Sequence, residues 1–195
     1  MKNLAQEGVK QNERLTMLVG IVLVAGLGLM ALTVTDVRRL LVEHFFVGLL
    51  LLPVVGLKMA STGWRFFRYY MGDKQYRGAG PPVLWMRLLA IVVVASTIAL
   101  FASGVELWVF GLRFGSVWVE VHKLSFAFWW PSVGLHVLGH AAQTWRGAKA
   151  ELEGAARGGA LTRRGLVVGS LVAGGVLAVA SLSYASPFVF FHNGG

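Results

Sequence analysis

Long uncharged apolar stretches recur along the chain. Four of them contain no Asp, Glu, Lys or Arg, and these are residues 15–35, 88–105, 124–145 and 165–195. A fifth stretch, 40–57, is apolar except for Glu43 and His44 near its start. Because about 20 apolar residues cross a bilayer as a helix, each stretch is long enough to span a membrane.

We therefore predict an all-α integral membrane bundle of five transmembrane helices, which forms a single domain over residues 1–195. The predicted spans lie near residues 15–35, 40–60, 86–110, 118–143 and 164–185. The first span is expected to be a retained anchor, because its apolar run is longer than the core of a signal peptide, which has about 7–15 residues. No stretch outside the spans is long enough for a separate catalytic domain.

Composition supports this assignment and limits the redox chemistry. Of the 195 residues, 56% are hydrophobic and 14% are charged, and the mean hydropathy is +0.66, which is too apolar for an ordinary soluble domain. The chain has no cysteine, which excludes disulfides, thiolate zinc sites, iron–sulfur clusters and covalently attached c-type haem. Any redox centre must therefore depend on histidine.

The basic residues predict how the chain is oriented. The 18 Lys and Arg outnumber the nine Asp and Glu and give a net charge of +9. All but four of them lie at the amino terminus or in the segments after the second and fourth spans, and the exceptions are Arg38, Arg39, Arg113 and Lys123. The positive-inside rule then places the amino terminus in the cytoplasm and the carboxyl terminus outside a bacterial inner (cell) membrane. Because the basic residues flank apolar segments, the partner that they indicate is membrane lipid and not nucleic acid.

Two of the histidines are expected at matching depth. The five histidines are His44, His122, His136, His140 and His192. His44 and His122 each lie about one turn into a span, and the second and fourth spans run in the same direction, so both imidazoles should lie near the outer face. Two neutral imidazoles at one depth on neighbouring helices can ligate haem b from both sides. Gly48, one turn after His44, would let the macrocycle approach the backbone, and no role is assigned to His192.

The sequence leaves a second, inner haem open. His136 lies 14 residues after His122, roughly 21 Å deeper and near the same helix face, which makes it a better inner ligand than His140. The residue 14 positions after His44 is Lys58. An inner haem would use His136 with a neutral Lys58, would have one protein ligand, or would be absent, and we favour a single haem. His136 and His140 could also form a different metal site together.

The histidine spacing carries a resemblance to a known family. Segment 43–58, with its EHFFVG start, and segment 122–140, with its HKL start and HVLGH end, resemble the ligand helices of the bacterial four-helix membrane cytochrome b superfamily. Its members serve as membrane subunits of hydrogenases, formate dehydrogenases and related oxidoreductases, or as quinol-linked electron carriers. The resemblance covers roughly residues 40–143. It implies a four-helix core with haem b ligated by His44 and His122, and electron exchange between quinone and a partner protein.

Charged residues at the predicted outer ends of the spans have two interpretations. The acidic ones are Asp36, Glu43, Glu106 and Glu120, and the basic ones are Arg38, Arg39, Arg113 and Lys123. One interpretation is a solvated rim of salt bridges. In the other, basic side chains neutralise haem propionates and a glutamate accepts the proton of a quinol that is oxidised nearby. Similarly, Trp129 and Trp130 either pack in the bundle or line a haem or quinone pocket.

The sequence thus predicts a b-type cytochrome that moves single electrons between a quinone pool and a redox partner through haem b near the outer face. Ligation by two imidazoles leaves no open iron position, which favours an electron relay over oxygen activation. Because no flavin, nicotinamide or molybdenum domain fits, we expect an electron-transfer subunit with no catalytic residues, served by an extracytoplasmic or membrane redox protein. The alternatives are a non-haem transporter subunit or assembly factor, in which His44 and His122 only pack, and a haem-handling or sensor protein.

Overall fold

The computed structural model describes residues 2–78, 84–152 and 159–182. Within these residues the chain forms six helices and no strand. The helices are α1 Lys2–Val34, α2 Leu41–Tyr70, α3 Lys74–Arg77, α4 Leu84–Phe110, α5 Val117–Leu152 and α6 Ala160–Leu182. The all-α prediction is confirmed for this part of the chain, and each of the five predicted spans overlaps one long helix.

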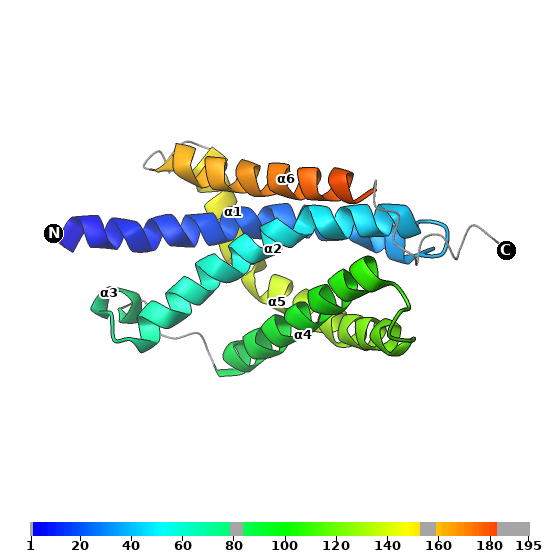
Figure 1. Cartoon of the computed structure of the whole chain (residues 1–195). Coiled ribbons are helices and arrows are strands. Elements are labelled where there is room, and N and C mark those ends of the chain that lie inside the picture. Colours follow the sequence, from blue (N-terminus) through cyan, green and yellow to red (C-terminus); the bar gives the residue numbers. More distant parts are fainter. Residues whose placement is uncertain (1, 79–83, 153–158, 183–195) are drawn as a thin grey trace.

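The five long helices alternate in direction (Figure 1). Helices α1, α4 and α6 run one way, and α2 and α5 run back. The turns at 35–40 and 111–116 therefore lie at the same end of the bundle, which we call the link end. Because α2 and α5 both begin at the link end, residues shortly after their starts come to a similar level.

The long helices form two groups. Helix α2 packs along α1 and α6, while α4 and α5 form an antiparallel pair. Contacts between the groups are sparser and are made by α2 with α4 and by α1 with α5. The looser interface between the groups leaves room for a cavity there.

Close packing within the first group depends on a glycine. A Cβ at Gly174 of α6 would collide with the backbone carbonyl of Leu50 of α2. In the same group, Val19, Val54 and Val167 from α1, α2 and α6 form a small apolar core. Small residues that let backbones approach are the usual means by which membrane helices pack.

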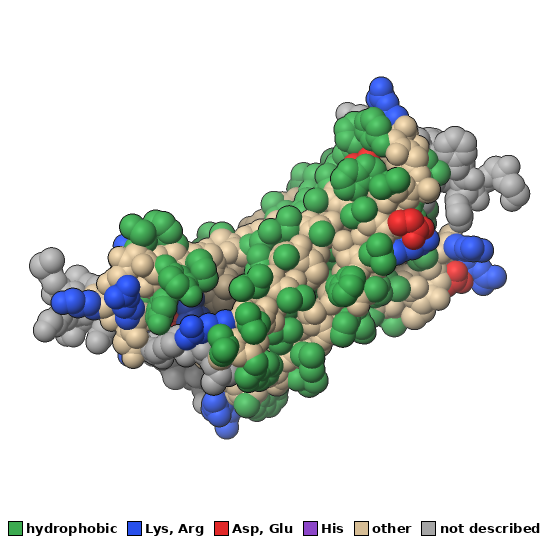
Figure 2. Space-filling view, turned by 90° about the horizontal axis from the view of Figure 1, so that it is seen from below, with side chains coloured by type: hydrophobic (Ala, Val, Ile, Leu, Met, Phe, Trp, Pro, Cys, Tyr) green, Lys and Arg blue, Asp and Glu red, His purple; other side chains and the backbone are tan. Residues whose placement is uncertain are grey.

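Four helices are long and apolar enough to cross a membrane. They are Glu7–Val34 within α1, Leu41–Tyr70, Leu84–Phe110 and Ala160–Leu182. Figure 2 shows apolar side chains over the middle of one face of the molecule, with Lys and Arg gathered toward its ends. This distribution indicates a multi-pass membrane protein.

Helix α5 differs from these four. Its 36 residues include the predicted span 118–143, but length and composition do not mark it as a membrane-spanning helix. Four tryptophans, a proline and three histidines lower its mean hydropathy. Pro131 also lies inside the helix, where it removes a backbone hydrogen bond.

The end of α2 opposite the link end is held by charged and aromatic contacts. Arg65 pairs with Glu13 of α1 at 3.2 Å. Arg68 pairs with Asp73 at 2.5 Å, and its guanidinium lies 5.6 Å from the ring centre of Trp64. Such a mixture of basic and aromatic residues at a helix end is typical of a membrane interface.

Candidate functional site

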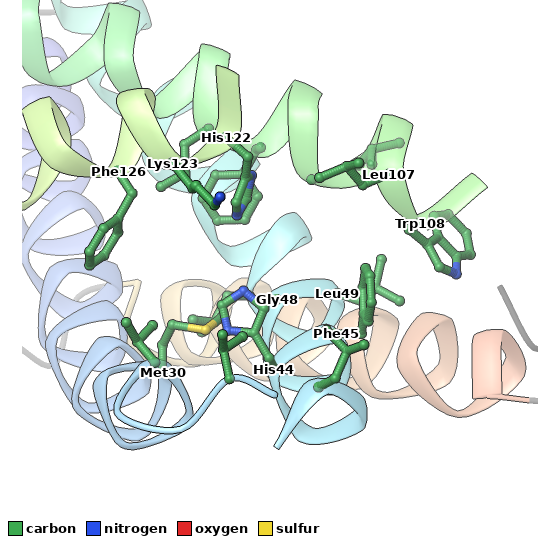
Figure 3. Close-up of a pocket in the computed structure, with 18 of the residues that line it drawn as sticks. Met30, His44, Phe45, Gly48, Leu49, Leu107, Trp108, His122, Lys123 and Phe126 are labelled. Atoms are coloured by element: carbon green, nitrogen blue, oxygen red, sulfur yellow. The ribbon is translucent and has the colours of Figure 1, made fainter. Parts of the chain in front are cut away.

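Two histidines from different helices face each other near the link end (Figure 3). His44 of α2 and His122 of α5 have ring centroids 6.2 Å apart and ring planes at 84°. Both rings belong to residues shortly after the start of a helix that begins at the link end. The structure thus brings together the two residues that the sequence placed at one depth.

The two rings border a cavity of about 370 Å³ between α2 and the α4–α5 pair (Figure 3). This volume lies within the range of roughly 300–1,000 Å³ that is usual for small-molecule sites. The charged residues that line the cavity are Arg38 and Lys123. Its aromatic lining residues, apart from the histidines, are Phe45, Phe101, Trp108, Phe126 and Trp129. Most of the remaining lining is aliphatic, so a bound ligand would be largely apolar.

Each imidazole is held by a hydroxyl from a neighbouring helix. Thr33 Oγ1 of α1 lies 3.0 Å from Nδ1 of His44, and Ser103 Oγ of α4 lies 3.1 Å from Nδ1 of His122. Thr33 and Ser103 are both buried. Residues from α1, α2, α4 and α5 therefore build the site, although sequence reasoning assigned no role to either hydroxyl.

Two glycines shape the site in different ways. A Cβ at Gly104 would lie 3.2 Å from Cε1 and 3.6 Å from Nδ1 of His122, so Gly104 makes room for this ring. Gly48, which the sequence singled out, lines the cavity. A Cβ at Gly48 would meet only Cε of Met30, at 3.6 Å, which is ordinary contact. Gly48 therefore widens the cavity, whereas Gly104 accommodates a protein side chain.

The basic residues expected near the outer face separate into two kinds. Arg38 and Lys123 line the cavity, and Arg39 and Arg113 are not among its lining residues. Arg39 pairs with Asp36 at 3.5 Å on the exposed turn, and the Arg113 guanidinium lies 5.9 Å from the ring centre of the next residue. Arg38 and Lys123 are thus the basic residues that can meet acidic groups of a ligand in the cavity.

The glutamates of the same region have different surroundings. Glu120 pairs with Lys123 at 3.0 Å, and Glu43 is exposed. Both carboxylate oxygens of Glu106 are buried, and among the described residues they have no hydrogen-bond partner. Glu106 lies between two residues that line the cavity, so it is the glutamate that the structure distinguishes as buried and unpaired.

The two adjacent tryptophans of α5, Trp129 and Trp130, also differ. Trp129 is buried, lines the cavity, and donates from Nε1 to Oγ1 of Thr97 of α4 at 2.9 Å. Trp130 is 51% exposed and is not among the lining residues. Trp129 therefore joins α5 to α4 along the wall of the cavity.

The candidates for an inner site each contact another residue of the described chain. Lys58 Nζ donates to the backbone carbonyl of Thr16 at 2.7 Å, which directs the amine toward α1. His136 lies beside His140 with ring centroids 4.8 Å apart, and its buried Nδ1 has no hydrogen-bond partner in the described part of the chain. Across residues 2–78, 84–152 and 159–182, no group of three or more His, Asp or Glu could hold a metal ion. His192 lies outside the described residues.

Neither a protein-family model, nor a curated protein sequence, nor a solved structure matches the chain. The function must therefore be argued from the geometry of the residues around His44 and His122. That geometry consists of two facing imidazoles, two hydroxyls that fix them, and an apolar cavity with Arg38 and Lys123 in its wall.

Proposed function

We propose that the chain is a membrane b-type cytochrome, which holds haem b between His44 and His122 and transfers electrons between a quinone pool and a redox partner. The observation that carries the proposal is the 6.2 Å separation of the two ring centroids beside an apolar cavity. Metal–imidazole bonds are about 2.0 Å long, so two of them on opposite sides of one iron separate the ring centroids by roughly 6 Å. The residues present therefore fit a haem with two histidine ligands.

The shortage of other ligands favours haem over a bare metal ion. Tetrahedral and octahedral metal sites need four to six donors, commonly imidazoles, carboxylates and water. The charged residues in the cavity wall are cations, and in the described residues no third His, Asp or Glu joins His44 and His122. A porphyrin supplies four nitrogen donors itself, so two imidazoles complete its coordination.

The surroundings of the two histidines suit this cofactor. Haem b supplies reversible one-electron transfer, and with imidazole on both sides of the iron it has no open position for oxygen. The aromatic and aliphatic lining would give the ring apolar surroundings, and Arg38 and Lys123, the latter paired with Glu120 in this structure, would neutralise the two propionates. Arg39 and Arg113, which do not line the cavity, have no such role in the proposal.

The proposal includes five membrane spans. Helix α5 has 36 residues, which at about 1.5 Å per residue exceeds the hydrocarbon core of roughly 30 Å. Five spans and the positive-inside rule make the link end the outer face of a bacterial inner membrane, with a cytoplasmic amino terminus and an outer carboxyl terminus. Spans α1, α2, α4 and α5 form the four-helix core that holds the haem.

The location of the site suggests how electrons reach it. A haem near the outer face exchanges electrons with quinone in the outer leaflet, and with an extracytoplasmic or membrane redox protein. Since we propose one haem, electrons reach the cytoplasmic side by mobile quinone and not through this chain. Its part is that of an electron-transfer subunit of an oxidoreductase.

The assignment of one haem depends on the inner residues. An amine ligates iron only when it is neutral and its lone pair points at the metal, and the hydrogen bond to the carbonyl of Thr16 holds Lys58 Nζ toward α1. A second haem would therefore have His136 as its only histidine ligand near that level. We expect His136→Ala to leave the haem content unchanged.

Haem quantification in the purified full chain tests the proposal. We expect one haem b per chain and a low-spin reduced-minus-oxidised spectrum. His44→Ala and His122→Ala should each abolish this signal, because each leaves one axial position without its ligand. His140→Ala, which removes a histidine of α5 that does not line the cavity, should leave the signal intact.

The remaining outcomes separate the alternatives. A colourless wild-type chain would mean a non-haem transporter subunit or assembly factor. Rapid loss of haem to a competing apoprotein would mean that haem is cargo, as in a haem-handling or sensor protein. Retention of the low-spin signal in both His44→Ala and His122→Ala would show that the assigned ligand pair is wrong.

A further inference from the structure

Thr33 and Ser103 contact the two imidazoles in the same way. Each hydroxyl oxygen lies about 3 Å from Nδ1 of its histidine, at 3.0 Å for Thr33 and 3.1 Å for Ser103. The two hydroxyls come from α1 and α4, which are the helices of the proposed core without a histidine. The two halves of the site thus have the same arrangement, in which a histidine of one helix contacts a hydroxyl of the antiparallel neighbouring helix.

The proton of each hydroxyl is already used within its own helix. Thr33 Oγ1 donates to the backbone carbonyl of Met30 at 2.7 Å, and Ser103 Oγ donates to that of Ala99 at 2.7 Å. A hydroxyl has a single proton, so toward the ring each oxygen can only accept. When each hydroxyl keeps its bond to the carbonyl, Nδ1 of both His44 and His122 is the donor toward it, and the lone pair is then on Nε2.

We infer that Thr33 and Ser103 are positioning residues that hold both histidines in the metal-binding tautomer and lower the reduction potential of the iron between them. This inference rests on the proposed haem function. A hydrogen-bond acceptor on the outer ring nitrogen makes a metal-bound imidazole more basic, and a more basic ligand stabilises the ferric state. The hydroxyls are neutral, so they orient the rings without adding a negative charge to an apolar site.

Burial makes the two hydroxyls hard to replace by water. Thr33 is 6% exposed and Ser103 is 0% exposed. Without Thr33, the N–H of His44 loses this acceptor in apolar surroundings, and a water molecule has little access to take its place. Without Ser103, His122 loses the hydroxyl contact to Nδ1 and keeps the backbone carbonyl of Leu100 as a partner. Both ring orientation and ligand basicity should then change.

Four single variants and one rescue variant test the inference on the full chain in detergent. Thr33→Val and Ser103→Ala remove the acceptor with little change in shape, and Thr33→Ser keeps it. Thr35→Val and Ser96→Ala are matched controls, because these hydroxyls donate to the backbone carbonyls of Leu32 and Val92 and not to a histidine ring. The readouts are haem affinity, measured by transfer to a competing apoprotein, and the midpoint potential of the haem that remains bound.

We expect about 10- to 100-fold weaker haem binding for Thr33→Val and Ser103→Ala, which is the usual effect of losing a hydrogen bond behind a metal ligand. The midpoint potential of the retained haem should become more positive in both, and further so in the double variant. Thr33→Ser, Thr35→Val and Ser96→Ala should remain close to the wild type.

Three results would overturn the inference, and they can be told apart. If the wild type holds haem but Thr33→Val and Ser103→Ala match their controls in both readouts, the hydroxyls do not position the ligands, and the haem function stands. If the affinity falls while the potential is unchanged, the role is one of packing only. If the wild type holds no haem, the proposed function and this inference fail together.

Discussion

Gly104 of α4 lies directly against the imidazole of His122 of α5, and a Cβ at this position would stand 3.2 Å from Cε1 of the ring. Side-chain carbons seldom approach so closely, so the glycine lets the ring lie next to the α4 backbone. The preceding residue, Ser103, reaches Nδ1 of the same ring at 3.1 Å. One short segment of α4 therefore supplies both the space and the hydrogen bond that hold His122.

Gly104→Ala should displace the His122 ring by a few tenths of an ångström and weaken haem binding. Overpacking a well-filled contact costs about 1–3 kcal/mol, which corresponds to roughly 5-fold or more in affinity. Haem titration into the apoprotein would measure this loss. Gly134→Ala is the matched control on α5, because a Cβ there has nothing within 4 Å. Equal affinities for the two variants would show that the room left by Gly104 is not needed.

Gly48→Ala should reduce haem binding in the cavity without reducing the stability of the fold. The added methyl group would meet only Cε of Met30, at 3.6 Å, so the apoprotein should unfold at the wild-type temperature. In the holoprotein the methyl group takes space from the cavity, and we expect a haem content several-fold lower, in line with a cost of about 1–3 kcal/mol for overpacking. Absorbance per chain and thermal melts would measure the two effects.

Gly28→Ala provides the control for this experiment, because a Cβ on that face of α1 has nothing within 4 Å. It should alter neither haem content nor stability. A wild-type haem content in Gly48→Ala would mean that the macrocycle does not lie against this turn of α2.

The helices could be predicted from the sequence because a lipid environment permits few charged residues inside a span. Uncharged runs therefore marked the positions of α1, α4, α5 and α6, and α2 needed only the exception of Glu43 and His44. Helix α5 has a weaker hydropathy signal, since His122 of the candidate site and two further histidines make the helix less apolar. In α5, polar residues such as His122 thus serve the candidate site and at the same time weaken the hydropathy pattern of a membrane span.

The pairing of His44 with His122 could be predicted because depth along a helix follows from counting residues from the turn. Counting residues from the turn could also have indicated that the hydroxyl of Thr33 lies close to His44. Thr33 lies two residues before the turn at 35–40 and His44 four residues after it, so the hairpin brings both within about one helical turn of the same level. Counting does not fix rotation about the helix axis, however, and most helical hydroxyls bond only to their own backbone.

The direction in which a side chain points, which counting does not give, also explains why the sequence could not show which basic residues line the cavity. Arg38 and Arg39 are consecutive in one turn, and nothing in their order shows which side chain turns toward the cavity. In the structure Arg38 lines the cavity, and Arg39 pairs with Asp36 on the surface. Such a choice depends on the backbone of the turn, which hydropathy does not encode.

Arg38→Gln should weaken haem binding about 10-fold and make the midpoint potential more negative. Hydrogen bonds to a charged group contribute about 1.5–3 kcal/mol, and Arg38 would lose such bonds to a propionate. Removing a positive charge near the iron also favours the ferric state, so this shift is opposite in sign to the one expected for Thr33→Val. Potentiometric titration of the purified chain measures both sign and size.

Arg39→Gln is the natural control for Arg38→Gln, because its side chain is 87% exposed and is paired on the turn. It should leave affinity and potential unchanged. If the two variants behave alike, the positive charge acts through the general field of the outer surface and not through contact in the cavity.

Gly174→Ala should destabilise the bundle without touching the candidate site. A Cβ at Gly174 collides with the backbone carbonyl of Leu50, and a backbone cannot turn aside as the end of a side chain can, so α6 must move away from α2. We expect the free energy of unfolding to fall by about 3 kcal/mol, which is at the upper end of the usual cost of overpacking. The melting temperature in detergent should fall by several degrees. Gly169→Ala on the same helix has nothing within 4 Å of the new Cβ and should melt like the wild type. Equal melting temperatures for the two variants would mean that α6 does not lie in direct contact with the backbone of α2.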